Sequence, residues 1–277
     1  MPELPEVETI ANNLRNGSGD QPSLIGCEIR RAHLLWERTL AEPTIDEFTK
    51  RVVGQVIQAI GRRGKFMYFN LTKDTLLVHL RMSGDVWIEP IIATWGEHYR
   101  LMLELSEGMR LVFSDTRKFG RVWLTEKPDL ILGHLGPEPL DDAFTVQKLF
   151  EGLQRRHRQL KPLLLDQTFI AGLGNIYTDE ALHLAGIHPL TISETLTIEQ
   201  AERLWFSIRN VLQAGIQRNG TSIDWVYRGG DYQNYLRVYG RAGEPCKECG
   251  TPIERMLVGQ RGTHFCPQCQ LNPSYQD

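Results

Sequence analysis

The sequence has few of the features that mark membrane or secreted proteins. Apolar runs such as Leu76-Leu77-Val78 are only a few residues long, whereas a membrane-spanning helix needs about 20 apolar residues. The first residues, Met-Pro-Glu-Leu-Pro-Glu-Val-Glu, are acidic and lack the apolar stretch of a signal peptide. These absences predict a cytoplasmic protein that does not bind membranes.

An excess of basic charge is also lacking, since 31 Lys and Arg residues face 34 Asp and Glu residues. Lys and Arg drive phosphate binding, so the total charge alone argues against a nucleic-acid partner, and the distribution of charge must decide. Hydrophobic residues make up 41% and charged residues 23% of the chain, which is ordinary globular composition and excludes a mostly disordered or fibrous protein.

The length of 277 residues favours two domains, or one large domain with an appendage. Helical spacing of Val7, Ile10 and Leu14 after Pro5 predicts a short amphipathic helix at the start. The pattern then changes to β-rich runs at 25–35, 52–60, 66–71, 76–80, 99–105, 110–113 and 121–124. The segment 134–140 is rich in Gly and Pro, and we expect it to be the linker.

Beyond the linker the apolar period becomes helical, around 146–153, 163–166 and 176–185. The clearest helix is expected over 198–217, where Thr197 and Gln200 have the spacing of a capping box. The C-terminal region is rich in turns and contains four of the five cysteines. We therefore expect an N-terminal β domain at 1–133, a helical domain at 141–235 and a cysteine-containing region at 236–277.

Two Cys-x2-Cys pairs, Cys246 with Cys249 and Cys266 with Cys269, are separated by sixteen residues. Hairpin knuckles of this kind can supply four thiolates to a tetrahedral zinc ion. Two disulfides, or reduced cysteines without a metal, are the alternatives, and the lack of a secretory signal favours zinc. Because four thiolates leave no open coordination position, we expect one structural Zn²⁺ rather than a catalytic metal.

The first residues also suggest a nucleophile. Methionine before a small residue such as Pro2 is normally removed, which leaves a secondary amine that is partly unprotonated at neutral pH. The neighbouring carboxyl groups of Glu3 and Glu6 can donate a proton or orient the amine. Capping of the helix N-terminus by acidic residues is the alternative for both.

Six motifs in a fixed order together resemble the formamidopyrimidine-DNA glycosylase family. They are Pro2-Glu3-Leu4-Pro5-Glu6-Val7-Glu8-Thr9, Gly64-Lys65, His79-Leu80-Arg81-Met82-Ser83-Gly84, Asp115-Thr116-Arg117-Lys118-Phe119-Gly120, Gly172-Leu173-Gly174-Asn175-Ile176-Tyr177, and Val238-Tyr239-Gly240-Arg241 before the cysteines. The resemblance implies an α+β protein. Its expected parts are an N-terminal antiparallel β-sandwich with an N-terminal helix, a helix-two-turn-helix domain and a C-terminal zinc-finger hairpin.

The resemblance implies a role for each matching residue. Pro2 is the Schiff-base nucleophile, Glu3 the proton donor, Glu6 a supporting carboxylate and Lys65 a catalytic lysine. Because the enzyme must extrude the damaged nucleotide to reach its sugar, Met82, Arg117 and Phe119 match the residues that fill the space it leaves. Other DNA contacts fall on His98, His157, Asn175 and Arg261, and Arg261 is also associated with the second elimination step.

Several of these residues have structural alternatives. Met82 and Phe119 can be core residues, Arg117 an ion-pair partner, His98 a packing residue and Asn175 part of a glycine-rich turn. His79 has no catalytic assignment and is expected to be structural. Two basic clusters can line a DNA cleft despite the acidic total: Arg155, Arg156, His157 and Arg158 with Lys161, and Arg62 and Arg63 with Lys65.

The expected activity is that of a bifunctional DNA glycosylase and lyase of base excision repair. It excises oxidised purines from damaged double-stranded DNA and then cleaves the strand by β,δ-elimination. The chain is expected to be monomeric, bacterial in type and to act at the nucleoid. An endonuclease-eight-like glycosylase for oxidised pyrimidines and a noncatalytic zinc-ribbon DNA-binding protein are the alternatives. The segment 220–235 bears on base recognition, without individual contacts being assignable.

Overall fold

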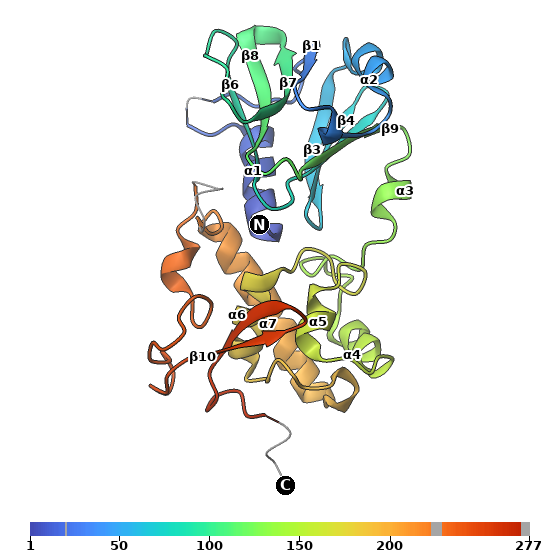
Figure 1. Ribbon diagram of the computed structural model, residues 1–277. Helices are drawn as coiled ribbons and strands as arrows, with labels where there is room; N and C mark the ends of the chain where they lie inside the picture. Colours follow the sequence, from blue (N-terminus) through green and yellow to red (C-terminus); the bar gives the residue numbers. More distant parts are fainter. Residues whose placement is uncertain (20, 223–228, 273–277) are drawn as a thin grey trace. The chain divides into compact units, whose positions relative to one another are not determined.

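The structure is a computed structural model that describes residues 1–19, 21–222 and 229–272. Met1–His134 form most of one compact unit, and Leu135–Thr221 form most of a second unit that continues from Asp231 (Figure 1). The mixed α+β class is confirmed, whereas the domain limits expected at 133, 140 and 235 stay predictions. Among the described residues, no helix combines the length and apolar character that crossing a bilayer requires.

The N-terminal unit contains helix α1 and two β-sheets (Figure 1). One sheet has the strand order β1-β7-β8-β6 and the other β2-β9-β5-β4-β3. Neighbouring described strands run antiparallel except β2 and β9, which pair in parallel at one edge. The elements are α1 Leu4–Asn16, β1 Ile29–Leu34, β2 Leu40–Glu42, α2 Ile45–Val52, β3 Ile57–Arg63, β4 Phe66–Leu71, β5 Thr75–His79, β6 Gly84–Pro90, β7 Tyr99–Leu105, β8 Met109–Asp115, β9 Arg121–Thr125 and α3 Asp129–Leu132.

Helix α1 is the predicted N-terminal helix, and it contacts strands of both sheets, namely β3, β4 and β6. Pro5 lies in its first turn, where a missing backbone N–H costs nothing. The apolar side chains of Val7, Ile10 and Leu14 are buried in the core that the two sheets share. This packing fixes the start of the helix, and therefore the first residues of the chain, against the sheets.

Several elements of this unit differ from the sequence-based prediction, among them α2, β2, β6 and α3. The run expected as one strand over 52–60 is the end of α2 followed by β3. Thr44 caps α2, since its hydroxyl accepts a hydrogen bond from Glu47 N at 3.4 Å, and Phe48 and Val52 are buried. Strand β6 was not predicted, although Val86 and Ile88 are buried and the residues beside them are half-buried, the period-two pattern of a strand.

The second unit consists of helices and a C-terminal hairpin. Its elements are α4 Val146–Gln154, α5 Leu160–Leu165, α6 Asn175–Ala185, α7 Ile198–Gln217, β10 Glu254–Val258 and β11 Arg261–Phe265. The capping box predicted at Thr197 and Gln200 is present, and it begins α7 as expected. Helix α6 contacts α5, α7 and β11. It is therefore buried on nearly all sides, including the side chains of Asp179 and Glu180.

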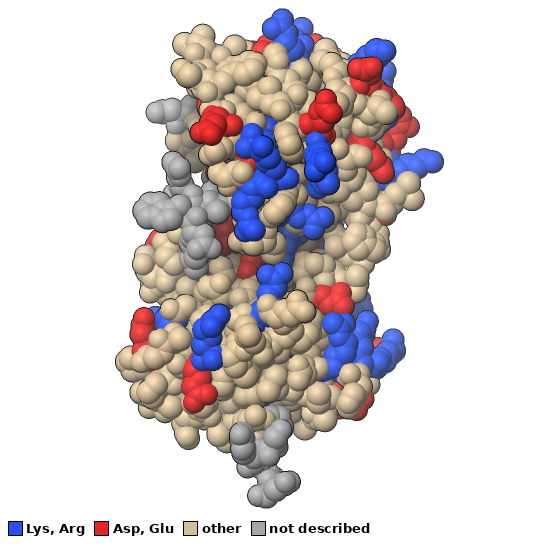
Figure 2. All heavy atoms as spheres, in the orientation of Figure 1, with Lys and Arg blue, Asp and Glu red and all other residues tan. Residues whose placement is uncertain are grey.

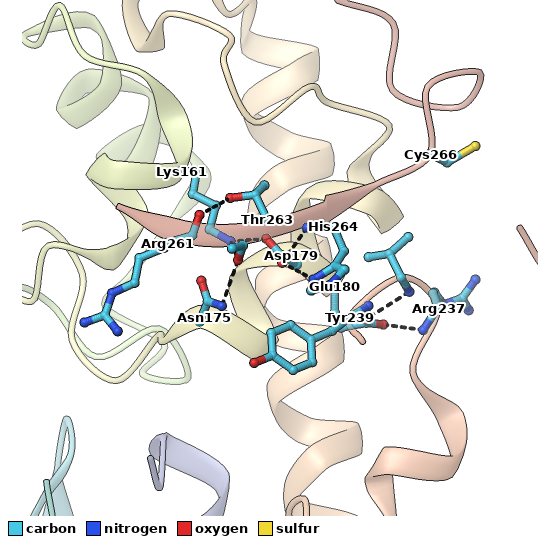
Figure 3. Close-up of polar contacts among 12 residues, drawn as sticks. Lys161, Asn175, Asp179, Glu180, Arg237, Tyr239, Arg261, Thr263, His264 and Cys266 are labelled. Atoms are coloured by element: carbon cyan, nitrogen blue, oxygen red, sulfur yellow. Dashed lines mark hydrogen bonds and ion pairs between the residues drawn. The ribbon is translucent and has the colours of Figure 1, made fainter. Parts of the chain in front are cut away.

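Two consecutive carboxylates of α6 hold the cysteine-containing region (Figure 3). Glu180 accepts hydrogen bonds from the backbone N–H groups of Arg237 at 2.8 Å and of Val238 and Tyr239 at 2.9 Å each. Burial raises the pKa of Glu180, while these three donors oppose the rise. The segment that leads to the first cysteine pair is thereby fixed to the helix.

Asp179 binds the hairpin itself. One carboxylate oxygen forms an ion pair with the fully buried Lys161, and the other accepts from the backbone N–H of His264 at 2.9 Å. Lys161 Nζ also lies 3.4 Å from the carbonyl oxygen of Gly262. A buried carboxylate is stable only when its lone pairs are occupied, so α5, α6 and β11 are fixed to one another through this group.

His79 lies at the end of β5 and is buried. From the sequence, a structural role is expected for it. Its Nδ1 accepts a hydrogen bond from Arg81 N at 3.0 Å, and its ring packs edge-on against Phe66. Burial lowers the pKa of His79, the charges of Arg81 and Lys65 add to the effect, and together they bring it to about 3. The imidazole is therefore neutral in the folded protein at neutral pH.

Replacing Asp179 by alanine should destabilise the second unit by about 3–5 kcal/mol, because Lys161 then lies buried without its counter-charge. Denaturant unfolding of both proteins measures the loss. The matched control is the double variant Lys161→Met, Asp179→Leu, which removes both charges and should recover much of the stability. A loss below about 1 kcal/mol for Asp179→Ala would show that the pair does not carry this packing.

Stability should fall with decreasing pH because of His79. Between pH 6.5 and about 3 the unfolded chain binds a proton at this position and the folded chain does not. The free energy of unfolding then decreases by up to about 1.4 kcal/mol per pH unit. His79→Gln, which keeps an acceptor for Arg81 N, should show a shallower decrease between pH 6.5 and 4.5. Equal slopes for the two proteins would contradict the assigned protonation state.

Candidate active site and nucleic-acid interface

The predicted catalytic carboxylates lie at the start of α1. Glu3 and Glu6 are each only 2% exposed, and Glu6 Oε2 accepts a hydrogen bond from Glu3 N at 2.8 Å. Pro2, directly before them, is buried, while Met1 is 36% exposed. Glu3 and Glu6 together form a capping box at the start of α1, so the capping alternative is present for both residues. Capping is compatible with a chemical role, because α1 packs on the sheets and so fixes the position of Pro2 and Glu3 at its start.

Lys65 lies in the tight turn between β3 and β4 and is 6% exposed. Arg62 braces this turn, since its Nε donates to Glu8 Oε2 at 2.9 Å and its Nη1 donates to the carbonyl oxygen of Gly64 at 3.0 Å. Glu8 belongs to α1. The turn that carries Lys65 is thus tied to the helix that follows Pro2.

The three residues expected to enter the DNA lie in two loops of the N-terminal unit. Met82 is half-buried in the turn 81–83, and Arg117 and Phe119 lie in the loop 116–119. Phe119 is 52% exposed, and the guanidinium carbon of Arg117 lies 5.0 Å from the centre of its ring. The core alternative for Phe119 is therefore wrong, and an exposed aromatic ring beside a cation suits contact with bases.

His98 is exposed, so the packing alternative does not describe its side chain. Its carbonyl oxygen accepts hydrogen bonds from Asp115 N at 2.9 Å and from Ser114 Oγ at 3.2 Å. These contacts place His98 beside the beginning of the loop that carries Arg117. A DNA contact of its imidazole stays a prediction.

In the second unit, Asn175 and Arg261 lie close to the same carbonyl group (Figure 3). Asn175 begins α6 after Gly174, and its Nδ2 donates to the carbonyl oxygen of Gly262 at 3.0 Å. Arg261 precedes Gly262 in β11, is exposed, and points away from Asp179. Asn175 and the arginine of the hairpin are therefore adjacent, as a shared phosphate site requires.

The basic clusters need two corrections. Lys161 is fully buried and paired with Asp179, so it cannot line a DNA surface. The Arg62 side chain is only 7% exposed and is paired with Glu8. His157, by contrast, is exposed, and its Nδ1 lies 2.6 Å from Glu194 Oε1. Figure 2 shows Lys and Arg side chains gathered in places on one face, with Asp and Glu side chains among them.

The four cysteines form a cluster in which all the sulfur atoms lie within 4.8 Å of one another. Tetrahedral coordination with Zn–S bonds of about 2.3 Å places sulfur atoms about 3.8 Å apart. Cys249 Sγ lies 3.4 Å from Cys266 Sγ, and Cys246 Sγ lies 3.9 Å from Cys269 Sγ. Backbone amides of Glu248 and Cys269 donate to Cys246 and Cys266. The four cysteines therefore fit a zinc site with four thiolate ligands.

Sequence reasoning missed the polar residues that hold these sites. Asp179 and Glu180 are two consecutive carboxylates in a helix with many apolar residues, which is itself a signal that they are buried with partners. Asp115 appeared only as part of a motif, without a role. The segment 220–235, expected to bear on base recognition, includes residues 223–228, which lie outside the described residues.

Comparison with known families matches three successive parts of the chain. Residues 1–122 match the formamidopyrimidine-DNA glycosylase N-terminal domain, and residues 135–226 match the H2TH domain of the same enzymes. Residues 243–272 match the zinc finger found in FPG and IleRS. These three ranges cover most of the sequence and follow one another in order.

Individual proteins are similar over their full length. The formamidopyrimidine-DNA glycosylases of Chloroflexus aggregans and Pelotomaculum thermopropionicum are 46% and 44% identical to this chain, with 98% of the chain and 99% of each relative covered. A solved structure of MutM in complex with DNA containing carbocyclic 8-oxo-G matches with a TM-score of 0.90 at 37% identity, covering 98% of this chain and 100% of that one.

Further solved structures show the Lactococcus lactis enzyme with other damaged DNA. One contains N7-benzyl-Fapy-dG and matches with a TM-score of 0.90, and another contains an abasic site and matches with a TM-score of 0.89, both at 36% identity. Each covers 98% of this chain and 100% of the solved chain. With its zinc-binding hairpin and its full-length match in sequence and fold, this chain belongs to the formamidopyrimidine-DNA glycosylase family.

Proposed function

We propose that this chain excises oxidised purines, 8-oxoguanine and formamidopyrimidines, from duplex DNA and then cleaves the abasic strand. The observation that carries the proposal is its full-length similarity, at a TM-score of 0.90, to a relative solved with DNA containing 8-oxo-G. The fixed position of Pro2 and Glu3 at the start of α1 supports the same chemistry. The proposed partner is damaged double-stranded DNA, bound by a cytoplasmic monomer that acts at the nucleoid.

The nucleophile is the secondary amine that Pro2 gains when the exposed Met1 is removed. The nitrogen lone pair bonds to the anomeric carbon while the base leaves with the electron pair of the glycosidic bond. Loss of the amine proton and opening of the sugar ring give an iminium ion. Its positive charge acidifies the neighbouring sugar hydrogen, so the 3′ phosphate leaves by β-elimination, and a second elimination releases the 5′ phosphate.

The other candidate residues support this reaction. Glu3 is the proton donor of the excision step, Glu6 holds the backbone of Glu3, and Lys65 lies near the target sugar and its phosphates. Met82, Arg117 and Phe119 fill the space left by the extruded nucleotide. The remaining proposed DNA contacts are His98, His157, Asn175 and Arg261, and Arg261 also assists the second elimination.

Borohydride reduction in the presence of an 8-oxoguanine duplex should trap a covalent complex, because the amine of Pro2 forms a reducible iminium ion. Mass spectrometry of the digested complex should place the adduct on the peptide that begins at residue 2. A duplex with thymine glycol should give much less adduct. An adduct only on Lys65 would contradict the assignment, and equal or preferential reaction with thymine glycol would favour the oxidised-pyrimidine activity.

Two variants serve as controls for this experiment. Insertion of a glycine between Met1 and Pro2 converts the proline amine into a peptide nitrogen, so no adduct should form on Pro2 while lesion binding persists. Glu3→Gln keeps the shape but cannot donate a carboxylic proton, so it should bind the lesion and fail to excise it. If the unaltered protein binds lesion DNA and never forms an adduct, the chain is a noncatalytic DNA-binding protein.

The zinc hairpin allows the metal and the arginine to be tested separately. Cys266→Ser removes a thiolate from a closed site, so zinc content and DNA binding should fall together. Arg261→Ala should keep one zinc per chain and the fold, while DNA affinity falls and its salt dependence becomes shallower by about one phosphate contact. Metal analysis and a salt titration measure both. Unchanged affinity and slope for Arg261→Ala would leave the arginine without a DNA role.

A further inference from the structure

One carboxylate joins the two loops that carry Met82, Arg117 and Phe119. Asp115, the last residue of β8, is 1% exposed. Its Oδ1 accepts hydrogen bonds from Ser83 Oγ and from Arg117 N, the latter at 3.1 Å. Its Oδ2 accepts from Gly120 N at 2.6 Å. The carboxylate thus closes its own loop at both ends and reaches the turn 81–83 as well.

Ser83 completes the connection. Its hydroxyl oxygen accepts a hydrogen bond from Arg117 N at 3.1 Å while its proton is donated to Asp115. Ser83 is 7% exposed and directly follows Met82. The residue that follows Met82 is therefore hydrogen-bonded, through its hydroxyl group, to the backbone of Arg117.

The base of this arrangement is rigid. Arg100, which is buried, donates from Nε to the carbonyl oxygen of Asp115 at 2.8 Å, and Asp115 N donates to the carbonyl oxygen of His98 at 2.9 Å. Gly120 lies so close to the core that a Cβ there would be 2.2 Å from Phe113 Cζ. These contacts hold the ends of the loop, whereas Phe119 at its tip is 52% exposed.

Each loop also contains a conformation that needs such support. Arg81 has a φ of 54° and Lys118 a φ of 61°, the left-handed region that L-residues other than glycine rarely adopt. Arg81 lies directly before Met82, and Lys118 lies between Arg117 and Phe119. Without the shared carboxylate, both turns would be free to relax and the three side chains would no longer be presented together.

We propose that Asp115, together with Ser83, is a positioning residue that presents Met82, Arg117 and Phe119 to the DNA as a single preorganised unit. The inference rests on the proposed function, in which these three side chains fill the space of the extruded nucleotide. The three side chains can compensate for the free-energy cost of unstacking the nucleotide only if ordering their own loops costs little of the binding free energy. The joint hydrogen bonding of the two loops meets that requirement before DNA is bound.

Two substitutions test the clamp. Asp115→Asn replaces an acceptor oxygen by an NH2 group that faces a backbone N–H, of Arg117 or of Gly120, in either orientation of the amide. Ser83→Ala removes the bridge between the loops while leaving Asp115 bonded to Arg117 N and Gly120 N. In single-turnover assays each should slow excision of 8-oxoguanine from duplex DNA by about tenfold or more, with cleavage of a preformed abasic site changed less than about twofold. A purely structural role would reduce both rates equally.

Asp74→Asn is the matched control. Asp74 is a buried carboxylate of the same unit that accepts from Gln55 Nε2 at 2.7 Å and pairs with Arg51, between β4 and β5. It should lower the melting temperature without separating the two rates. If Asp115→Asn fails to fold, Ser83→Ala, the truncation of a small side chain, decides the question.

The combined variant separates this proposal from the proposed function. Met82, Arg117 and Phe119 are changed together to alanine, with and without Ser83→Ala. Ser83→Ala should have no further effect in the triple variant, because it acts through those side chains. If the triple variant excises 8-oxoguanine normally, the void-filling part of the proposed function fails. If the triple variant is slow while Ser83→Ala and Asp115→Asn are not, the clamp is refuted and the proposed function stands.

Discussion

The structure depends on a single constraint, which is that a carboxylate removed from water must have its oxygens occupied by donors. Asp115, Asp179 and Glu180 are each 1% exposed or less. Their acceptor oxygens are occupied mainly by backbone N–H groups of loops and of a hairpin that have little apolar surface of their own. The buried charge therefore fixes segments that hydrophobic packing alone could not fix.

In two places the buried carboxylate fixes the ends of a segment, while the residue proposed to contact DNA stays exposed on that segment. Asp115 holds the ends of a loop whose tip exposes Phe119, and Asp179 holds a strand from which Arg261 projects. In each case the residue proposed to meet DNA makes few of the contacts that stabilise the fold. A substitution at the tip should therefore change DNA binding, whereas a substitution of the carboxylate changes the presentation of several tips at once.

The sequence predicted the residues of this site better than it predicted what holds them. The Cys-x2-Cys spacing, the helix after Pro5 and the capping box at Thr197 are local patterns, and each appears as expected. Lys161 was misplaced because a lysine near three arginines resembles a surface cluster, and only the tertiary structure brings Asp179 within reach. The link between Ser83 and Asp115 spans 32 positions, so no local pattern could indicate it.

Amide hydrogen exchange tests the role of the buried carboxylates most directly. The N–H groups of Gly120, Val238, Tyr239 and His264 donate to Asp115, Glu180 and Asp179. Although they lie in loops, connecting segments or a two-stranded hairpin, they should exchange only through global unfolding, with protection within about tenfold of that of β4 in the core. The N–H of Lys118, in the same loop as Phe119, should exchange much faster. Exchange of the Gly120, Val238, Tyr239 and His264 amides as fast as that of Lys118 would show that the carboxylates do not fix these segments, and would contradict the account.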